Sequence, residues 1–122
     1  MYLYGASGHG KVIKEILEEL GVEVKAFIDD DDSLSSFCGV PVVRPSAQMS
    51  PIIVSIGNCQ ERKNVVKRLN CDFATAIHAT AIVSLSAIIE EGTVVMHGAI
   101  VQADTVIGKH CIINTKTSID HE

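Results

Sequence analysis

The fold is decided by residues 77–119, which read IHATAI, VSLSAI, IEEGTV, VMHGAI, VQADTV, IGKHCI, INTKTS and I in successive groups of six. An aliphatic residue opens every group, the fifth residue is always small, and the sixth is aliphatic until Ser118. Neither the helical period of 3.6 nor the strand period of 2 produces this pattern. A six-residue period is the signature of a parallel β-helix built from hexapeptide repeats.

The spacing has a direct structural interpretation. One hexad forms a short strand and a turn, and three hexads close one triangular coil. The first residue of each hexad points inward and stacks on its equivalent in the next coil, while the fifth must be small because it lies in a tight corner. We therefore predict that residues 75–122 form the start of a β-helix domain, with two complete coils through Ile112 and part of a third.

Residues 1–74 have a different pattern. Apolar runs predict strands at 2–4, 22–28, 42–43 and 52–56, and one-sided apolar spacing predicts helices at 11–20 and 60–69. Alternating strands and helices of this length form a parallel sheet with right-handed crossovers. We expect an α/β, Rossmann-like domain that precedes the β-helix.

Composition excludes several classes of function. The 122 residues carry a net charge of −5, only 4% aromatics and no Trp, which disfavours a nucleic-acid partner. No apolar run is long enough to span a bilayer, so we expect a soluble, cytoplasmic chain without membrane insertion. The four cysteines form no CxxC pair, which argues against a zinc site, and we expect them to be mostly buried.

Candidate ligand-binding residues follow three of the predicted strands. The first is the turn Gly5-Ala6-Ser7-Gly8-His9-Gly10, where glycines allow close backbone approach and the N-terminus of a helix favours a phosphate. Asp29 and Asp30 end the second strand and are suited to accept hydrogen bonds from a ribose or a base. Gly57 and Asn58 end the strand at 52–56, whereas Asp31 and Asp32 are interpreted as a solvated loop.

The chain resembles the bacterial sugar acetyltransferases of the left-handed β-helix superfamily. The resemblance rests on these motifs, the hexads and the terminal His121-Glu122, which occur in the same order along the sequence. UDP-4-amino-sugar N-acetyltransferases of bacillosamine-type glycan synthesis are the most similar members, and sialic-acid O-acetyltransferase-like proteins are relatives. The resemblance implies a UDP-linked amino sugar as substrate, acetyl-CoA as co-substrate, no metal, and a homotrimer in the full-length form.

The same resemblance implies roles for individual residues. His121 is the expected general base, because a neutral imidazole accepts a proton near neutral pH, and the Glu122 carboxylate strengthens it. Asn114 is assigned to acetyl-CoA binding. Substrate contacts are expected at the glycine turn, the aspartate pair and the residues after the strand at 52–56: Gly5, Ser7, Gly8, His9, Gly10, Asp29, Asp30, Gly57 and Asn58.

Family members continue for several more coils, so we expect a truncated piece of an enzyme of about 200 residues that binds nucleotide sugar with little activity. Two alternatives stay open: O-acetylation of a sialic-acid-like hydroxyl, and a non-catalytic nucleotide-binding or assembly module. Outside the site, the helix residue Arg62 is expected to face solvent. We expect three further histidines to be surface or corner residues without metal-ligand spacing, namely His78, His97 and His110.

Overall fold

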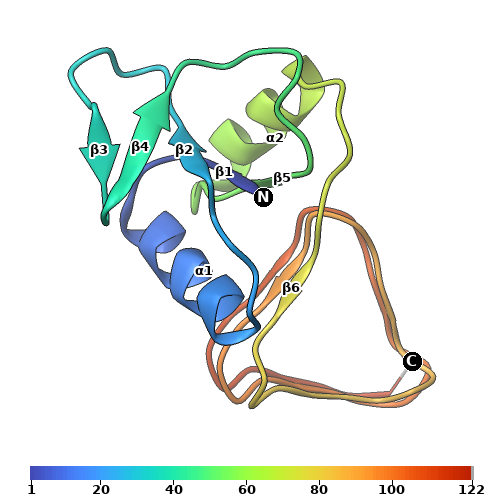
Figure 1. Cartoon of the computed structure of the whole chain (residues 1–122). Coiled ribbons are helices and arrows are strands. Elements are labelled where there is room, and N and C mark those ends of the chain that lie inside the picture. Colours follow the sequence, from blue (N-terminus) through green and yellow to red (C-terminus); the bar gives the residue numbers. More distant parts are fainter. Residues whose placement is uncertain (122) are drawn as a thin grey trace.

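The computed structural model describes residues 1–121. Its N-terminal part is a sheet with two helices, and its C-terminal part is a triangular parallel β-helix that begins with β6 (Figure 1). Among residues 1–121, no helix has the length and apolar character required to cross a membrane.

The N-terminal sheet has the strand order β3-β4-β2-β1-β5. All neighbouring strands are parallel except β3, which runs antiparallel to β4. The elements of this part are β1 (Tyr2–Tyr4), α1 (Gly8–Glu19), β2 (Ala26–Ile28), β3 (Ser36–Phe37), β4 (Val40–Val43), β5 (Ile52–Val54) and α2 (Cys59–Arg68). The predicted strand at 22–28 is therefore shorter than expected, since only its last three residues join the sheet.

The two helices cover opposite faces of the sheet, as the alternation of side chains along its strands requires. Leu3, Phe27 and Ile53 lie side by side in register and pack with the buried residues of α1. Tyr4 and Val54 belong to the opposite face, which packs with Val65 of α2. Both central strands are thus buried on two sides, which explains their continuous apolar sequences.

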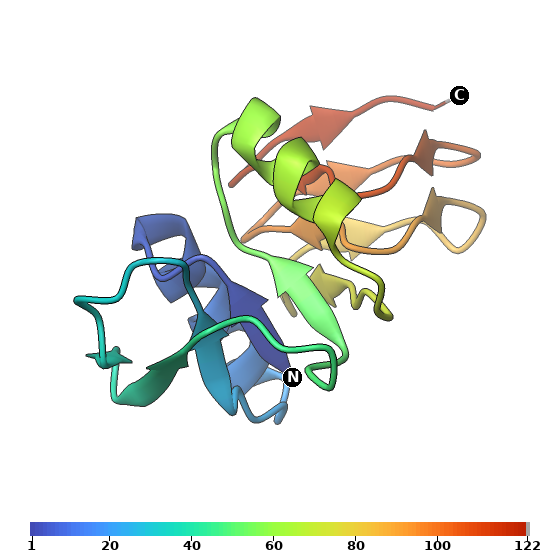
Figure 2. The same ribbon diagram turned by 90° about the horizontal axis from the view of Figure 1, so that it is seen from above.

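The β-helix is built from two-residue strands, each paired with the equivalent strand of the next coil (Figure 2). Ala76 pairs with Val94 and Val94 with Ile112, each eighteen residues further on. The strands are β6 (Ala76–Ile77), β7 (Ile82–Val83), β8 (Ile88–Ile89), β9 (Val94–Val95), β10 (Ile100–Val101), β11 (Val106–Ile107), β12 (Ile112–Ile113) and β13 (Ser118–Ile119).

The first residue of every hexad lies in the interior, as predicted. All eight belong to one apolar cluster, in which Val95 and Val101 are almost completely buried. Burial of each such side chain contributes about 1.5–3 kcal/mol. The small fifth residues lie in the corners: buried Thr93 donates to the carbonyl oxygen of Gly108 at 2.7 Å, and Thr105 donates to that of Asp120 at 3.1 Å.

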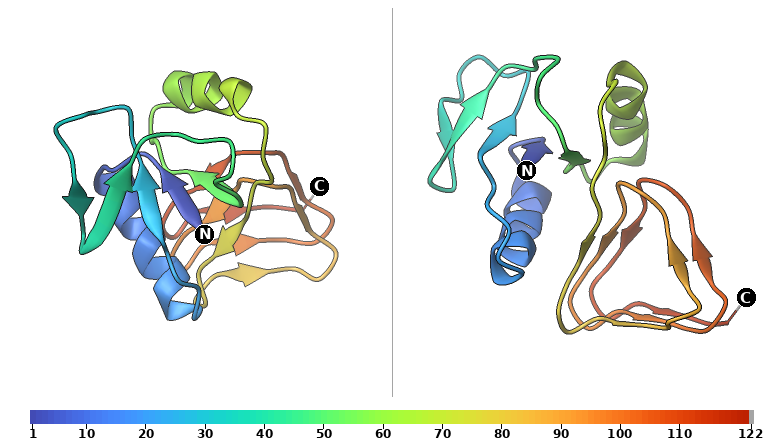
Figure 3. Two further views of the ribbon diagram at one scale, coloured as in Figure 1. Left: turned by 45° about the horizontal axis from the view of Figure 1, so that its top comes forward. Right: turned by 45° about the vertical axis from the view of Figure 1, so that its right-hand side comes forward.

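The sixth residues lie in different environments on the three sides of the triangle. On the β6-β9-β12 side, Ala76 and Val94 are buried against α1 and the N-terminal sheet. On the other two sides Ile82, Ile88 and Val106 are more than half exposed. Figure 3 shows the cause of this difference in burial: α1 lies between the sheet and one side of the β-helix only.

The expectation that the cysteines are mostly buried was wrong. Cys38 and Cys59 are exposed, Cys71 and Cys111 are intermediate, and none of the four forms a disulfide in the described part of the chain. Cys38 lies in a turn with a φ of 49°, and Cys59 is the first residue of α2, so both are placed by chain geometry rather than by packing.

Candidate functional site

A cavity of about 610 Å³ opens at the carboxyl ends of β1, β2 and β5. This is the edge at which ligands of open α/β sheets bind. Its walls include six of the residues predicted from sequence, Gly5, Ser7, Asp29, Asp30, Gly57 and Asn58. The other walls come from β1 and α2, among them Tyr4, Glu61, Asn64 and Arg68. The structure thus brings together three motifs that are far apart in the sequence.

The glycine turn is held tightly against β5. Gly5 has a φ of +119°, and a Cβ there would lie 2.8 Å from Cγ1 of Ile56, so only glycine fits. The buried hydroxyl of Ser55 donates to the carbonyl oxygen of Gly5 at 2.8 Å. Gly10 is also required by packing, since a Cβ there would lie 2.5 Å from the same oxygen. Neither Gly8 nor Gly10 lines the cavity.

The N-terminus of α1 faces this turn without a side-chain cap. Ser7 is the N-cap residue, but its hydroxyl makes no cap hydrogen bond and instead approaches the carbonyl oxygen of Ser55 at 3.4 Å. The first amides of a helix carry a partial positive charge and seek an acceptor. An anion bound beside Ser7 would supply that acceptor.

Asp29 and Asp30 have different environments. Both carboxylate oxygens of Asp29 accept backbone amides, from Ala6 at 3.0 Å and from Asp31 at 2.9 Å, so this residue shapes the glycine turn. Asp30 is exposed and accepts from the Tyr4 hydroxyl, with Arg68 3.6 Å away. Burial and then the Asp30 charge raise the pKa of Tyr4. Asp31 and Asp32 are exposed, as expected.

A second cavity, of about 360 Å³, lies between the N-terminal part and the β-helix. It shares Gly57 with the first cavity and is lined by His9, Cys59, Arg62, Met96, Ile112 and Asn114. Nε2 of His9 is buried there without a hydrogen-bond partner among residues 1–121. Burial, followed by the nearby charge of Arg62, lowers the pKa of His9 and keeps its imidazole neutral. The sequence-predicted His9 and Asn114 therefore line the same cavity.

The prediction that Arg62 faces solvent was wrong. Its side chain is buried, and its guanidinium donates to the carbonyl oxygens of Ile56, Gly57 and His110 at 2.9–3.0 Å. The position carries a signal that was missed, because Arg62 lies three and four residues before Val65 and Val66, on the packed stripe of α2.

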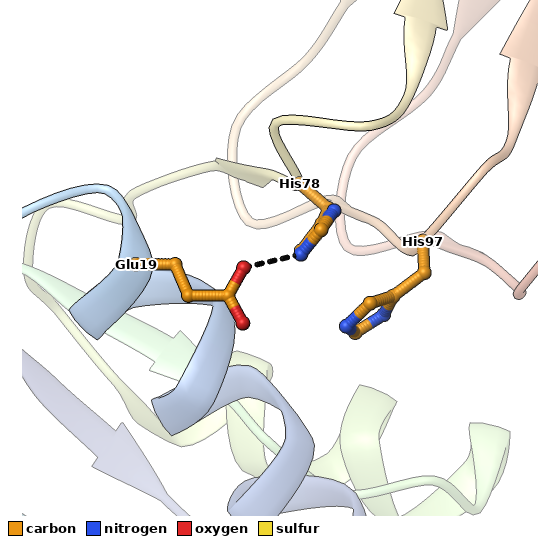
Figure 4. A group of neighbouring side chains, drawn as sticks. All are labelled: Glu19, His78 and His97. Carbon is orange, nitrogen blue, oxygen red and sulfur yellow. Dashed lines mark hydrogen bonds and ion pairs between the residues drawn. The ribbon is translucent and has the colours of Figure 1, made fainter.

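The expectation of surface or corner positions without metal-ligand spacing was wrong for His78 and His97, whereas His110 does lie in a turn of the β-helix. His78 is buried, and its Nε2 lies 2.6 Å from Oε2 of Glu19 at the end of α1 (Figure 4). The ring of His97 stacks on that of His78 with centroids 3.8 Å apart. The possible ligand atoms of Glu19, His78 and His97 lie within 4.8 Å of one another, which is the proximity that a transition-metal site would need.

The hydrogen bonds around His78 favour a structural hydrogen bond between His78 and Glu19 over a metal site. The backbone amide of Thr80, which can only donate, points at Nδ1 of His78 at 3.0 Å. Nδ1 is then the acceptor, so the proton lies on Nε2 and is donated to Glu19. A metal would require that Nε2 to be unprotonated. Glu19 and His78 thus join α1 to the first coil of the β-helix.

His121 lies apart from both cavities. It is exposed, its backbone amide donates to Oδ1 of Asp120 at 2.9 Å, and it lines neither cavity. In Figure 1 the red ribbon of the last described residues ends on the side of the triangle remote from the N-terminal sheet. Its predicted partner Glu122 lies outside the described residues.

Comparison with known proteins identifies relatives with the same architecture. Over 107 residues the chain is 40% identical to a UDP-N-acetylbacillosamine N-acetyltransferase of Bacillus subtilis, a match covering 77% of this chain and 50% of the relative. The structure is similar to that of PerB from Caulobacter crescentus in complex with CoA and GDP-perosamine, with a TM-score of 0.87 and 33% identity. That match covers 98% of this chain and 62% of the other.

A third similar structure is the acetyltransferase domain of PglB from Neisseria gonorrhoeae in complex with acetyl coenzyme A, with a TM-score of 0.84 and 35% identity over 98% of this chain and 63% of that one. The chain thus spans from half to less than two thirds of the length of these relatives. The family model described as the PglD N-terminal domain matches residues 1–69, more than half of the sequence. The chain therefore belongs to the PglD N-terminal domain family.

Proposed function

We propose that the whole protein transfers an acetyl group from acetyl-CoA to the amino group of a nucleotide-linked amino sugar, with UDP as the nucleotide. The observation that carries this proposal is the pair of cavities that meet at Gly57. One is lined by Gly5 and Ser7, directly before the uncapped N-terminus of α1, and the other contains the His9 imidazole, whose Nε2 has no hydrogen-bond partner among residues 1–121. Two relatives support the same chemistry: the Bacillus subtilis protein is named a UDP-N-acetylbacillosamine N-acetyltransferase, and a second similar structure is that of a perosamine N-acetyltransferase from Caulobacter crescentus.

In this proposal the nucleoside and diphosphate occupy the larger cavity and the amino sugar enters the smaller one. Gly5, Ser7, Gly8 and Gly10 form the phosphate turn, with Asp29 as its brace and Asp30 as an acceptor for ribose or base. Gly57 and Asn58 form the opposite wall. His9 is proposed to hydrogen-bond the sugar through Nε2, and burial, which lowers its pKa, favours the neutral imidazole.

The chemical step is aminolysis of a thioester. The sugar amine attacks the thioester carbonyl and forms a C–N bond, the tetrahedral intermediate then breaks its C–S bond, and CoA leaves as the thiol. His121 is proposed to accept the proton that the amine loses, with Glu122 beside it, and Asn114 to contact acetyl-CoA. Much of the acceleration would come from holding two substrates together.

His121 can serve this reaction only if a second copy of the chain brings it to the cavities of the first. We therefore include an oligomer in the proposal, and we take it to be the homotrimer that the family resemblance implies. The exposed sixth residues of the hexads support it, because Ile82, Ile88 and Val106 cover two sides of the β-helix with apolar surface.

The unpaired cysteines fit action in the reducing cytoplasm.

Nucleotide binding is tested by thermal melting of the chain with UDP, GDP and NAD. We expect UDP to raise the melting temperature and NAD to leave it unchanged. If GDP raises the melting temperature more than UDP does, GDP replaces UDP as the proposed nucleotide. If no nucleotide raises the melting temperature, the proposal is overturned.

Catalysis is tested in the whole protein by thiol release from acetyl-CoA, with a panel of amino and hydroxyl sugars. We expect turnover with a 4-amino sugar, and loss of turnover with retained UDP binding in His121→Ala. Turnover with hydroxyl acceptors alone would favour O-acetylation, and an unaffected His121→Ala variant would remove the assigned base.

A further inference from the structure

Arg62 joins three stretches of chain through one buried guanidinium. Nη1 donates to the carbonyl oxygens of Ile56 at 2.9 Å and Gly57 at 3.0 Å, both in the loop after β5. Nε donates to the carbonyl oxygen of His110, in a turn of the β-helix, at 2.9 Å. A planar fork with fixed donor directions can satisfy these acceptors together, whereas the single ammonium of a lysine cannot.

The acceptor in the β-helix is itself firmly placed. His110 has a φ of 55°, its amide donates to the carbonyl oxygen of Glu91 at 3.0 Å, and its ring meets that of Phe73 edge-on. Gly92 makes room for the ring, because a Cβ at Gly92 would lie 2.0 Å from Nδ1 of His110. Arg62 therefore anchors the loop after β5 to a rigid part of the β-helix.

The bonds to two successive carbonyl groups determine where the next amides point. In a trans peptide the N–H is directed opposite to the C=O. Since the carbonyl groups of Ile56 and Gly57 point at Arg62, the amides of Gly57 and Asn58 point away from it. Neither amide donates a hydrogen bond to another group within residues 1–121. Successive amides directed to one side form an anion-binding concavity.

These two amides belong to residues that line the larger cavity. The side-chain oxygen of Asn58 does not compete with an anion for these amides, because Oδ1 accepts the amide of Glu61 at 3.0 Å and caps α2. Arg62 also forms no ion pair with a carboxylate in the described part of the chain. Its charge therefore adds to the attraction of the two amides for an anion.

We propose that Arg62 is a positioning residue that turns the carbonyl groups of Ile56 and Gly57 away from the cavity and thereby presents the amides of Gly57 and Asn58 to the phosphates of a bound nucleotide. It acts on the phosphates through the backbone and not by direct contact. The proposal rests on the proposed function, because the ligand is the nucleotide assigned there.

The test compares UDP with uridine, which lacks the phosphates. Calorimetric titration is carried out on the chain and on its Arg62→Lys and Arg62→Met variants, well below their melting temperatures. We expect both variants to bind UDP about tenfold more weakly, the effect of a lost hydrogen-bond arrangement, and to bind uridine as the unchanged chain does. Lys67→Met, which removes an exposed cation from the same helix, should change neither affinity.

Each other outcome overturns the positioning role. Unchanged UDP affinity in Arg62→Lys would mean that charge alone is needed, and equal loss of UDP and uridine binding would mean a general structural effect. If the unchanged chain binds no UDP, the proposed function itself fails.

A measurement on the unsubstituted chain covers the case in which the variants do not fold. In amide NMR spectra, UDP should shift the resonances of Gly57 and Asn58, and uridine should shift them less. Absence of a shift at both amides when UDP is bound would contradict the proposal.

Discussion

The hydroxyl of Tyr4 donates to both carboxylate oxygens of Asp30, at 3.1 and 3.2 Å. Tyr4 is the last residue of β1 and is paired in register with Ile28 at the end of β2, two residues before Asp30. This pairing sets the carboxylate at the mouth of the larger cavity, where Arg68 approaches it from α2. Asp30 is thus held from two sides at the position expected to contact a ribose or base.

Tyr4→Phe removes this bond and keeps the buried ring. Because Asp30 would then be less fixed, we expect UDP affinity to fall about threefold to tenfold, with a loss of stability of about 1 kcal/mol. Calorimetric titration and urea unfolding measure the two effects. Tyr2→Phe, on the same strand, is the matched control, and an equal effect of both variants would show that Asp30 needs no support from Tyr4.

Gly10→Ala should destabilise the fold because its Cβ would lie 2.5 Å from the carbonyl oxygen of Gly5 and 2.9 Å from Cε1 of Phe27. We expect a loss of about 1–3 kcal/mol in urea unfolding. Gly8→Ala is the matched control, since its Cβ would have no neighbour within 4 Å. That variant should be neutral or up to about 1 kcal/mol more stable, because alanine favours the helix. Similar losses in both variants would refute the assigned contact.

Stability should decrease as the pH falls below about 6.5. Burial lowers the pKa of both His9 and His110, so between the ordinary and the lowered pKa the unfolded chain binds more protons than the folded chain. This contribution is complete above the ordinary value and is lost as the pH falls through the lowered one.

Near His110, Glu91 opposes the shift, whereas Lys109 and Arg62 add to it. Urea unfolding at pH 7.5 and 5.5 measures the dependence, and His110→Gln should reduce it. If the difference in unfolding free energy between pH 7.5 and 5.5 is unchanged in His110→Gln, the pH dependence arises from other groups.

Val106→Glu should disrupt the proposed trimer without unfolding the chain, because Val106 is 63% exposed in the protomer. Placing a carboxylate in an apolar interface costs more than the contact contributes. Size-exclusion chromatography with light scattering should give a smaller particle, with an unchanged circular dichroism spectrum. Gln102→Glu adds the same charge at an exposed turn and should leave the mass unchanged. A trimeric Val106→Glu would exclude this side of the β-helix from the interface.

The β-helix was predictable because its signal repeats in every coil. The first residue of each hexad always points into the interior of the β-helix, so its aliphatic character repeats along the whole sequence. The sixth positions were less informative. Val94 and Val106 are the same residue type, yet one is 2% exposed and the other 63%, because α1 covers one side of the triangle.

The site was predictable where it depends on the ends of strands, and obscure where it depends on contacts between the two parts of the chain. Motifs after β1, β2 and β5 meet because parallel strands share a carboxyl edge. Arg62 and His78 could not be placed in this way, since their partners His110 and Glu19 lie 48 and 59 residues away. A charged residue is assigned to solvent by default. The spacing of Arg62 from Val65 and Val66 indicates the packed side of α2, but it does not identify the partner.

Side-chain type in the β-helix repeats every six residues, whereas the surroundings of each side chain repeat every eighteen, as the pairing of Ala76 with Val94 and of Val94 with Ile112 requires. Insertion of a single hexad after Val83 would preserve the aliphatic rhythm but rotate all later coils by one third of a turn. Val94 would then leave its place beneath α1, and Ile88 would take it. Insertion of eighteen residues would return each later residue to its own side of the triangle, one coil further along, so the pattern tolerates added whole coils better than added single hexads.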